Sequence, residues 1–119
     1  MIVTAWKNGK HRSRGVAYGI RLKAEDRKAY FRKSWKSVFL KLEGKSKLVE
    51  VNIKKESFWG SKRPKSTDCR ELIHKGIRAW LKKKFRHRWK KRHPTKLIME
   101  HLKGRKFVVF RFDVRDRLQ

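Results

Sequence analysis

The surplus of positive charge is the feature that most constrains this chain. Its 119 residues include 37 Lys and Arg against 10 Asp and Glu, which gives a formal net charge of +27 at pH 7. Like charges at this density repel one another in a compact body, and the repulsion lowers the stability of the folded state. The charge excludes an acidic solvating segment and argues against a neutral metabolic domain. It is typical of a protein that a polyanion normally neutralises.

The composition nevertheless predicts a folded chain. High net charge is common in disordered proteins, but 38% of these residues are hydrophobic and 12% are aromatic, including five Trp. Aromatic side chains bury large apolar areas on folding. We therefore expect one domain over residues 1–119, with a basic arm at 1–15 and a mobile tail at 113–119.

The sequence also bears on the compartment. No apolar run approaches the roughly 20 residues that cross a bilayer, and residues 1–9 lack the apolar core of a secretory signal. Cys69 is the single cysteine, which excludes a disulfide within the chain and a thiolate zinc cluster. We expect an intracellular, cytoplasmic protein without a membrane partner, and its oligomeric state stays open.

Several stretches alternate apolar with polar residues, which is the pattern of half-buried strands. The predicted strands are 16–22, 38–42, 48–53, 95–101 and 105–112, preceded by a short strand or arm and a loop within 1–15. The turn residues Glu43-Gly44 join the second and third of these strands into a hairpin. The last strand is apolar on both faces and is expected to be central. A short helical turn is predicted at 24–31 and a loop at 57–66.

One amphipathic helix is predicted over residues 68–84. Asp68 has the position of an N-cap with Glu71 as its capping-box partner. Apolar residues fall at helical spacing on one face, namely Cys69, Ile73, Ile77, Trp80 and Leu81. Gly76 inside this helix marks either a close packing contact or a weak point. The fold class is therefore α+β: a curled antiparallel sheet or pseudobarrel of about five to seven strands with one main amphipathic helix.

Two segments concentrate the positive charge. Residues 82–92 hold eight Lys or Arg and no acid, and residues 1–24 also lack any acid. Because each phosphate contact releases counterions, about 6–10 contacts suffice for strong, salt-dependent binding. We expect nucleic-acid binding by a surface made of 6–15, 54–65 and 82–92. The candidate binding residues are Lys7, Lys10, Arg12, Arg14, Lys54, Lys62, Arg63, Lys83, Arg86, Arg88, Trp89, Lys90 and Arg92.

Double-stranded DNA is the favoured partner over RNA. A single-strand binder needs exposed aromatic platforms, and Trp6, Phe58, Trp59 and Trp89 are better explained as core residues packed under loops. Known RNA-binding signatures such as a GXXG loop are missing. The Arg residues of the arm and of the 54–65 loop are the expected base readers, while Lys residues hold phosphates.

Catalysis is not expected, nor is a cofactor or a metal. The five His lack the spacing of known zinc sites. Glu50, Asn52 and Lys54 share one strand face, but Asn52 stands where a magnesium-dependent nuclease needs a second carboxylate. Two alternatives stay open: a ribosome- or RNA-associated structural protein, and a small ribonuclease or toxin that uses His11 or His87 with Tyr30.

The order of elements over residues 16–112 resembles the DNA-binding pseudobarrel domains of some restriction endonucleases and plant transcription factors. The features in common are a first strand at 17–22, the aromatics Tyr30-Phe31, a hairpin at 38–53, a helix with a basic end at 71–81, and a closing strand pair ending in 107–112. This resemblance implies a barrel whose arms grip the major groove.

Overall fold

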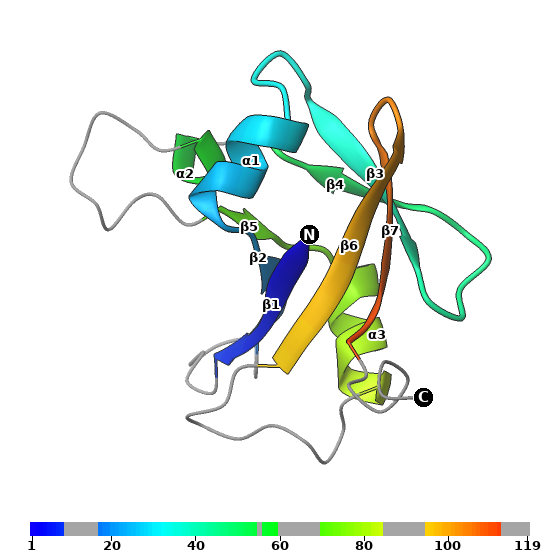
Figure 1. Cartoon of the computed structure of the whole chain (residues 1–119). Helices are drawn as coiled ribbons and strands as arrows, with labels where there is room; N and C mark the ends of the chain where they lie inside the picture. Colours follow the sequence, from blue (N-terminus) through cyan, green and yellow to red (C-terminus); the bar gives the residue numbers. More distant parts are fainter. Residues whose placement is uncertain (9–16, 55, 60–69, 85–94, 113–119) are drawn as a thin grey trace.

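The computed structural model describes residues 1–8, 17–54, 56–59, 70–84 and 95–112. Within them seven strands form one strongly curled sheet, and helices pack around it (Figure 1). The strand order is β4-β3-β7-β6-β1-β2-β5. The strands are β1 (Ile2–Asn8), β2 (Ala17–Arg21), β3 (Ser37–Leu42), β4 (Val49–Asn52), β5 (Glu71–Leu72), β6 (Thr95–Lys103) and β7 (Lys106–Arg111), and the helices are α1 (Ala24–Tyr30), α2 (Glu56–Trp59) and α3 (Lys75–Lys84). The predicted α+β barrel-like fold is confirmed.

Most neighbouring strands are antiparallel, as predicted, and the hairpin β3–β4 pairs Val38 with Val51. The exception is β3 with β7, which pair in parallel with Leu40 opposite Phe107. The predicted antiparallel sheet therefore contains one parallel pair. The parallel pair brings two segments about 67 positions apart in sequence into one register. It also makes β7 a central strand between β3 and β6, as its two apolar faces predicted.

Alternation along each strand decides which side chains fill the barrel. Tyr18 and Ile20 of β2 and Phe107 and Val109 of β7 point inward and are buried, whereas Arg21 points out. Because side chains alternate between the faces of a strand, each strand contributes a buried set and an outer set. The strand predictions from period-two alternation are confirmed. Of the strand or arm expected within 1–15, the structure shows a strand, β1, which pairs with β2 and β6.

The barrel has two ends, and each takes its name from an adjacent feature. The hairpin end is named after the β6–β7 hairpin, whose turn lies there, and α1 and α2 lie beside this end (Figure 1). The turn of the other hairpin, β3–β4, lies at the opposite end. There the ring of Phe31 stacks on Phe107 with centroids 4.8 Å apart and meets Phe58 at 5.6 Å. The helix end carries the last turn of α3, whose buried Trp80 and Leu81 complete the core.

Helix α3 begins later than predicted. Residues 71–72 form β5, in which Leu72 pairs with Ile20 of β2, so the expected helix over 68–84 is wrong before Lys75. Glu71 binds Arg21 across the strands at 2.6 Å and is no capping-box residue. Ile73, expected on the buried helix face, is 45% exposed. The predicted cap Asp68 and apolar-face residue Cys69 lie outside the described residues, and the predicted loop at 57–66 contains the end of α2.

Of the two alternatives for Gly76, the structure shows the close packing contact. A Cβ built at Gly76 would lie 3.2 Å from Cγ2 of Val49 in β4 and 3.1 Å from Nδ1 of His74. The start of α3 therefore sits directly against the edge strand β4, although α3 follows β5 at the opposite edge of the sheet. This contact places the start of α3 between β5, which precedes it in the chain, and the opposite edge strand β4.

His74 caps α3 in place of the predicted Asp68. Its Nδ1 accepts a hydrogen bond from the backbone N–H of Gly76 at 2.9 Å, and its carbonyl accepts the first helical bond from Arg78 at 3.0 Å. Replacing His74 by Ala should cost about 1 kcal/mol of unfolding free energy, because the Gly76 N–H loses its acceptor. His74→Asn keeps an acceptor and should retain most of the stability in urea denaturation. Equal losses in both variants would contradict the capping role.

Gly19 gives a second test of the fold. It pairs with Trp6 across β1 and β2, and a Cβ at Gly19 would lie 2.6 Å from the indole ring. Gly19→Ala should therefore destabilise the protein by about 1–3 kcal/mol through overpacking. In a double-mutant cycle, Trp6→Ala should remove most of this penalty because the clashing ring is gone. Additive losses in the cycle would show that the two residues do not touch.

Candidate nucleic-acid interface

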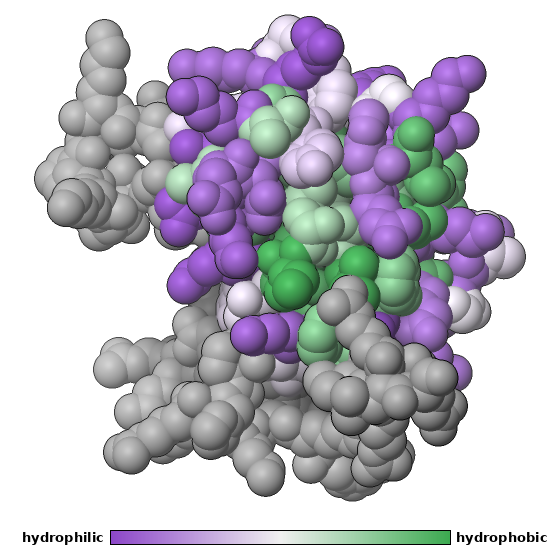
Figure 2. Space-filling model, viewed as in Figure 1, coloured by the Kyte–Doolittle hydropathy of each residue, from purple (hydrophilic) through white to green (hydrophobic). Residues whose placement is uncertain are grey.

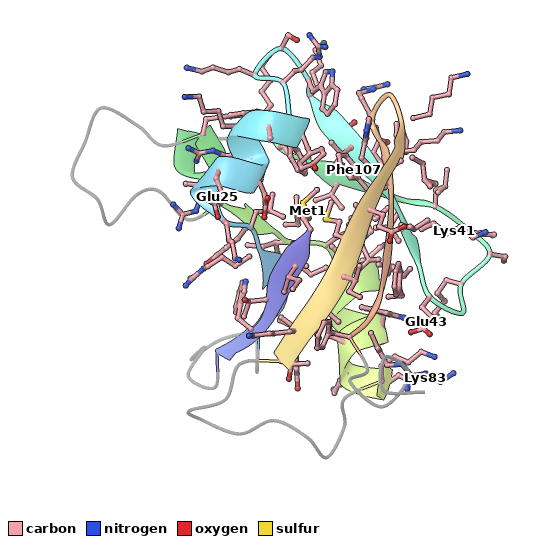
Figure 3. The ribbon with its side chains drawn as sticks, in the orientation of Figure 1. Met1, Glu25, Lys41, Glu43, Lys83 and Phe107 are labelled. Carbon is pink, nitrogen blue, oxygen red and sulfur yellow. The ribbon has the colours of Figure 1, made fainter. Side chains whose placement is uncertain are left out.

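Six cations lie on segments at the helix end and form what we call the helix-end cluster. They come from four parts of the chain: the end of β3, the turn after it, the last turn of α3 and the last residue of β7. The members are Lys41, Lys45, Lys82, Lys83, Lys84 and Arg111. All are exposed except Lys84, which is half-buried. Figure 3 shows Lys41, Glu43 and Lys83 on one side of the molecule.

Two contacts fix the α3 end against the β3–β4 turn, and a third joins this turn to β7. The indole N–H of Trp80 donates to the carbonyl oxygen of Glu43 at 2.8 Å. Nζ of Lys84 reaches the backbone of Gly44, where a built Cβ would lie 3.3 Å away. Oε1 of Glu43 accepts hydrogen bonds from the backbone N–H and Nε of Arg111 at 3.2 and 3.0 Å. The cluster is therefore positioned by packed structure on three elements.

Glu43 is the acid placed among these cations. Burial raises the pKa of its carboxyl, but the hydrogen bonds from Arg111 and the charges of Arg111 and Lys84 outweigh burial. The pKa of Glu43 therefore lies below its ordinary value. One ionised carboxylate leaves the cluster with a large positive excess, so Glu43 holds Arg111 in place without neutralising the surface.

The predicted binding residues fall in different places. Lys7 lies on β1 opposite Tyr18, near the helix end, and Lys83 belongs to the helix-end cluster. Lys54 follows β4 and lies at the hairpin end, because β4 runs away from the β3–β4 turn. The structure thus places Lys54 and Lys83 at opposite ends of the barrel. The other predicted residues lie outside the described residues: Lys10, Arg12, Arg14, Lys62, Arg63, Arg86, Arg88, Trp89, Lys90 and Arg92.

The strand ends that flank two of the predicted basic segments share the helix end. Asn8 pairs with Ala17, so residues 9–16 join two adjacent strands there. Thr95, where β6 starts, pairs with Ala5 of β1, and α3 ends at Lys84. The chain therefore enters and leaves the stretches 9–16 and 85–94 from the end that carries the helix-end cluster.

Of the described aromatic side chains expected in the core, Phe58 lies in it, Trp59 packs against it, and Trp6 is only half-buried. Phe58 is 1% exposed, and the half-buried Trp59 donates from Nε1 to the carbonyl oxygen of Ile53 at 2.9 Å. Trp6 is half-buried, with its ring against Gly19. Tyr30 is 42% exposed and packs its ring at 6.3 Å from that of His101. Tyr30 is the acid–base candidate of the ribonuclease alternative. Its expected partners, His11 and His87, lie outside the described residues.

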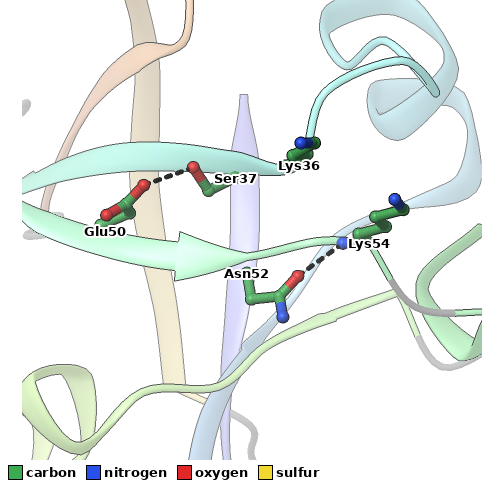
Figure 4. A pocket seen from close by; sticks show the side chains of 5 residues that line it. All are labelled: Lys36, Ser37, Glu50, Asn52 and Lys54. Atoms are coloured by element: carbon green, nitrogen blue, oxygen red, sulfur yellow. Dashed lines mark hydrogen bonds between the residues drawn. The ribbon is translucent and has the colours of Figure 1, made fainter.

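A second feature lies at the hairpin end, on the outside of β3 and β4. An open hollow of about 420 Å³ is lined by Lys36, Ser37, Glu50, Asn52 and Lys54 (Figure 4). It unites the Glu50–Asn52–Lys54 group that the sequence placed on one strand face. The described residues hold no group of three His, Cys, Asp or Glu that could bind a metal ion. Lys36 and Ser37 were missed, because no pattern in the sequence marks residues that meet only across a hairpin.

The outer face seen in Figure 2 carries an apolar strip. Hydrophilic side chains cover much of this face and border an apolar strip (Figure 2). Half-buried Ile2, Ile98 and Phe110 lie in register across β1, β6 and β7. A polyanion is accordingly attracted to the cation-rich ends more strongly than to the middle of this sheet face.

Comparisons with known proteins give no relative: no family model, curated protein or solved structure matches the chain. Among the described helices, none combines the length and apolar character needed to span a membrane.

The Glu43–Arg111 pair predicts a pH-dependent stability term. A carboxyl whose folded pKa is lowered stabilises the protein above its unfolded pKa, and this contribution is lost as the pH falls through the folded pKa. Glu43→Gln should therefore cost up to about 1 kcal/mol at neutral pH, the range for exposed pairs. The difference from wild type should shrink towards zero in acid, measured by urea denaturation. Glu100→Gln controls for the loss of one negative charge, and a Glu43→Gln penalty independent of pH would contradict this role.

Proposed function

We propose that this protein binds nucleic acid, with double-stranded DNA as the favoured partner, and that the helix end is the contact surface. The observation that carries the proposal is the helix-end cluster, in which six cations from separate segments converge beside one paired carboxylate. A protein keeps such a concentration of like charge at a cost in stability. Binding to a polyanion offsets that cost.

The geometry of the cluster supports contact with a phosphate backbone. Lys82 and Lys83 extend from the last turn of α3, where cations also interact favourably with the helix dipole. Lys41 and Lys45 extend from the adjacent strand end and turn, which Trp80 holds against the helix. Ammonium groups held at several positions each provide a contact for a phosphate of the duplex backbone. Such contacts set the register of the protein on the duplex without reading its sequence.

The sequence extends this surface in both directions. The basic residues predicted at 10–14 and 86–92 belong to the stretches whose flanking residues lie at the helix end. Arg residues in those stretches supply the groups that bind guanine in a bidentate manner in a major groove. The described cluster would then hold the backbone, and the flanking stretches would contribute any preference for sequence.

Paired lysine substitutions test this proposal. The double variant Lys82→Gln plus Lys83→Gln removes two contacts. It should raise the Kd for a short mixed-sequence duplex roughly 10–100-fold in dilute salt. Lys36→Gln with Lys54→Gln removes the same charge at the hairpin end and should have a much smaller effect on the duplex. Fluorescence anisotropy measures both affinities. Equal weakening by both double variants would contradict the helix end as the interface, and tighter binding of RNA than of duplex DNA would contradict the preferred partner.

A further inference from the structure

The hollow at the hairpin end contains two ammonium groups that no described carboxylate engages. Lys36 precedes β3 and Lys54 follows β4, and both side chains are exposed. Glu50 lines the same hollow, yet no ion pair joins it to either Lys within the described part of the chain. Both cations are therefore available to an anionic ligand.

The other polar groups of the hollow already form hydrogen bonds within the protein, and each has one group left to bind a ligand. The backbone N–H of Lys54 donates to Oδ1 of Asn52 at 2.8 Å, which leaves the amide NH₂ of Asn52 to donate outward. The Ser37 hydroxyl donates to Oε2 of Glu50 at 2.7 Å, which leaves Oε1 as an acceptor (Figure 4). The hollow thus offers two cations, one donor and one acceptor within a small volume.

Arg105 lies over the ring of the half-buried Phe39 next to these groups, and neither residue lines the hollow. Phe39 pairs directly with Glu50 across the hairpin, and the guanidinium carbon of Arg105 lies 5.3 Å from the centre of the Phe39 ring. Lys106 pairs with Phe39 on the other side and is exposed. Aromatic rings and guanidinium planes are the surfaces on which unpaired bases stack.

This combination selects among phosphate-containing ligands. A volume of about 420 Å³ falls in the range of about 300–1,000 Å³ that small-ligand sites occupy. A bare phosphate has no use for the acceptor on Glu50, because it would bring a second negative charge towards that carboxylate. A duplex turns its base edges inward. An unpaired nucleotide presents a phosphate together with sugar and base donors, and so satisfies every group in the hollow.

We propose that the hollow is a second site that binds one unpaired nucleotide of a single strand. Lys36 and Lys54 hold its phosphate, Asn52 donates to the sugar or base, and Oε1 of Glu50 accepts from a donor of the same nucleotide. This site is separate from the duplex contact at the helix end. The protein then binds a duplex at one end of the barrel and a single strand at the other.

Reciprocal double variants test the second site. A labelled single-stranded DNA without self-complementarity is titrated with wild-type protein, with Lys36→Gln plus Lys54→Gln, and with Lys82→Gln plus Lys83→Gln as the matched control. The hairpin-end variant should weaken single-strand binding roughly tenfold or more, and the control should weaken it far less. Equal effects of the two variants on the single strand would overturn the proposal. A failure of the duplex proposal is seen separately, in the duplex titrations.

Glu50→Ala separates specific binding from simple charge attraction. The variant raises the net positive charge by one, so charge attraction alone gives tighter single-strand binding. Loss of the acceptor should instead weaken binding several-fold to about tenfold. Asn52→Ala, which changes no charge, should weaken binding in the same direction and provides a second readout if loss of the Ser37 contact disturbs the fold. Tighter binding by Glu50→Ala, or unchanged binding by Asn52→Ala, would overturn the site.

Discussion

The contact between α3 and the edge of the curled sheet is the constraint on which the rest of the structure depends. Gly76 lets the helix start approach Val49, and Trp80 binds the carbonyl of Glu43 near the helix end. These contacts hold α3 against β4 and against the β3–β4 turn. The curl of the sheet buries the apolar set of each strand and leaves the cations outside, where water and ions screen their mutual repulsion. The same contacts bring the last turn of α3 beside β3 and β7, so the fold and the cation cluster have one cause.

The strands could largely be predicted from the sequence, because alternation reports directly on which face is buried. The start of α3 could not. Leu72 is fully buried and fits a helical stripe as well as a strand, and its place in β5 depends on pairing with Ile20, about 50 residues earlier. The parallel pairing of β3 with β7 is also set by distant contacts. Periodicity describes one segment at a time, and so it does not contain this information.

Less of the candidate binding site than of the fold could be predicted from the sequence. Charge density along the chain identified Lys83, but it did not show that Lys41 and Arg111 lie at the same end of the barrel, because these residues are each isolated in sequence. It also grouped Lys54 with segments from the opposite end. The hollow combines Lys36 with Glu50 across the β3–β4 hairpin. From the sequence, only the residues on one strand face, Glu50, Asn52 and Lys54, could be grouped. Local density reveals how many cations a protein carries, while topology decides which of them act together.

We propose that cations held on the curled sheet and on α3 bind the phosphates of a duplex. Because phosphate contacts release counterions, the logarithm of the affinity should fall linearly with the logarithm of the salt concentration, by about 0.9 for each contact. The most direct measurement is the affinity of the wild-type protein for duplex DNA across a salt series. We expect a steep slope that corresponds to about six or more contacts. An affinity that does not change with salt, or no binding in dilute buffer, would contradict it.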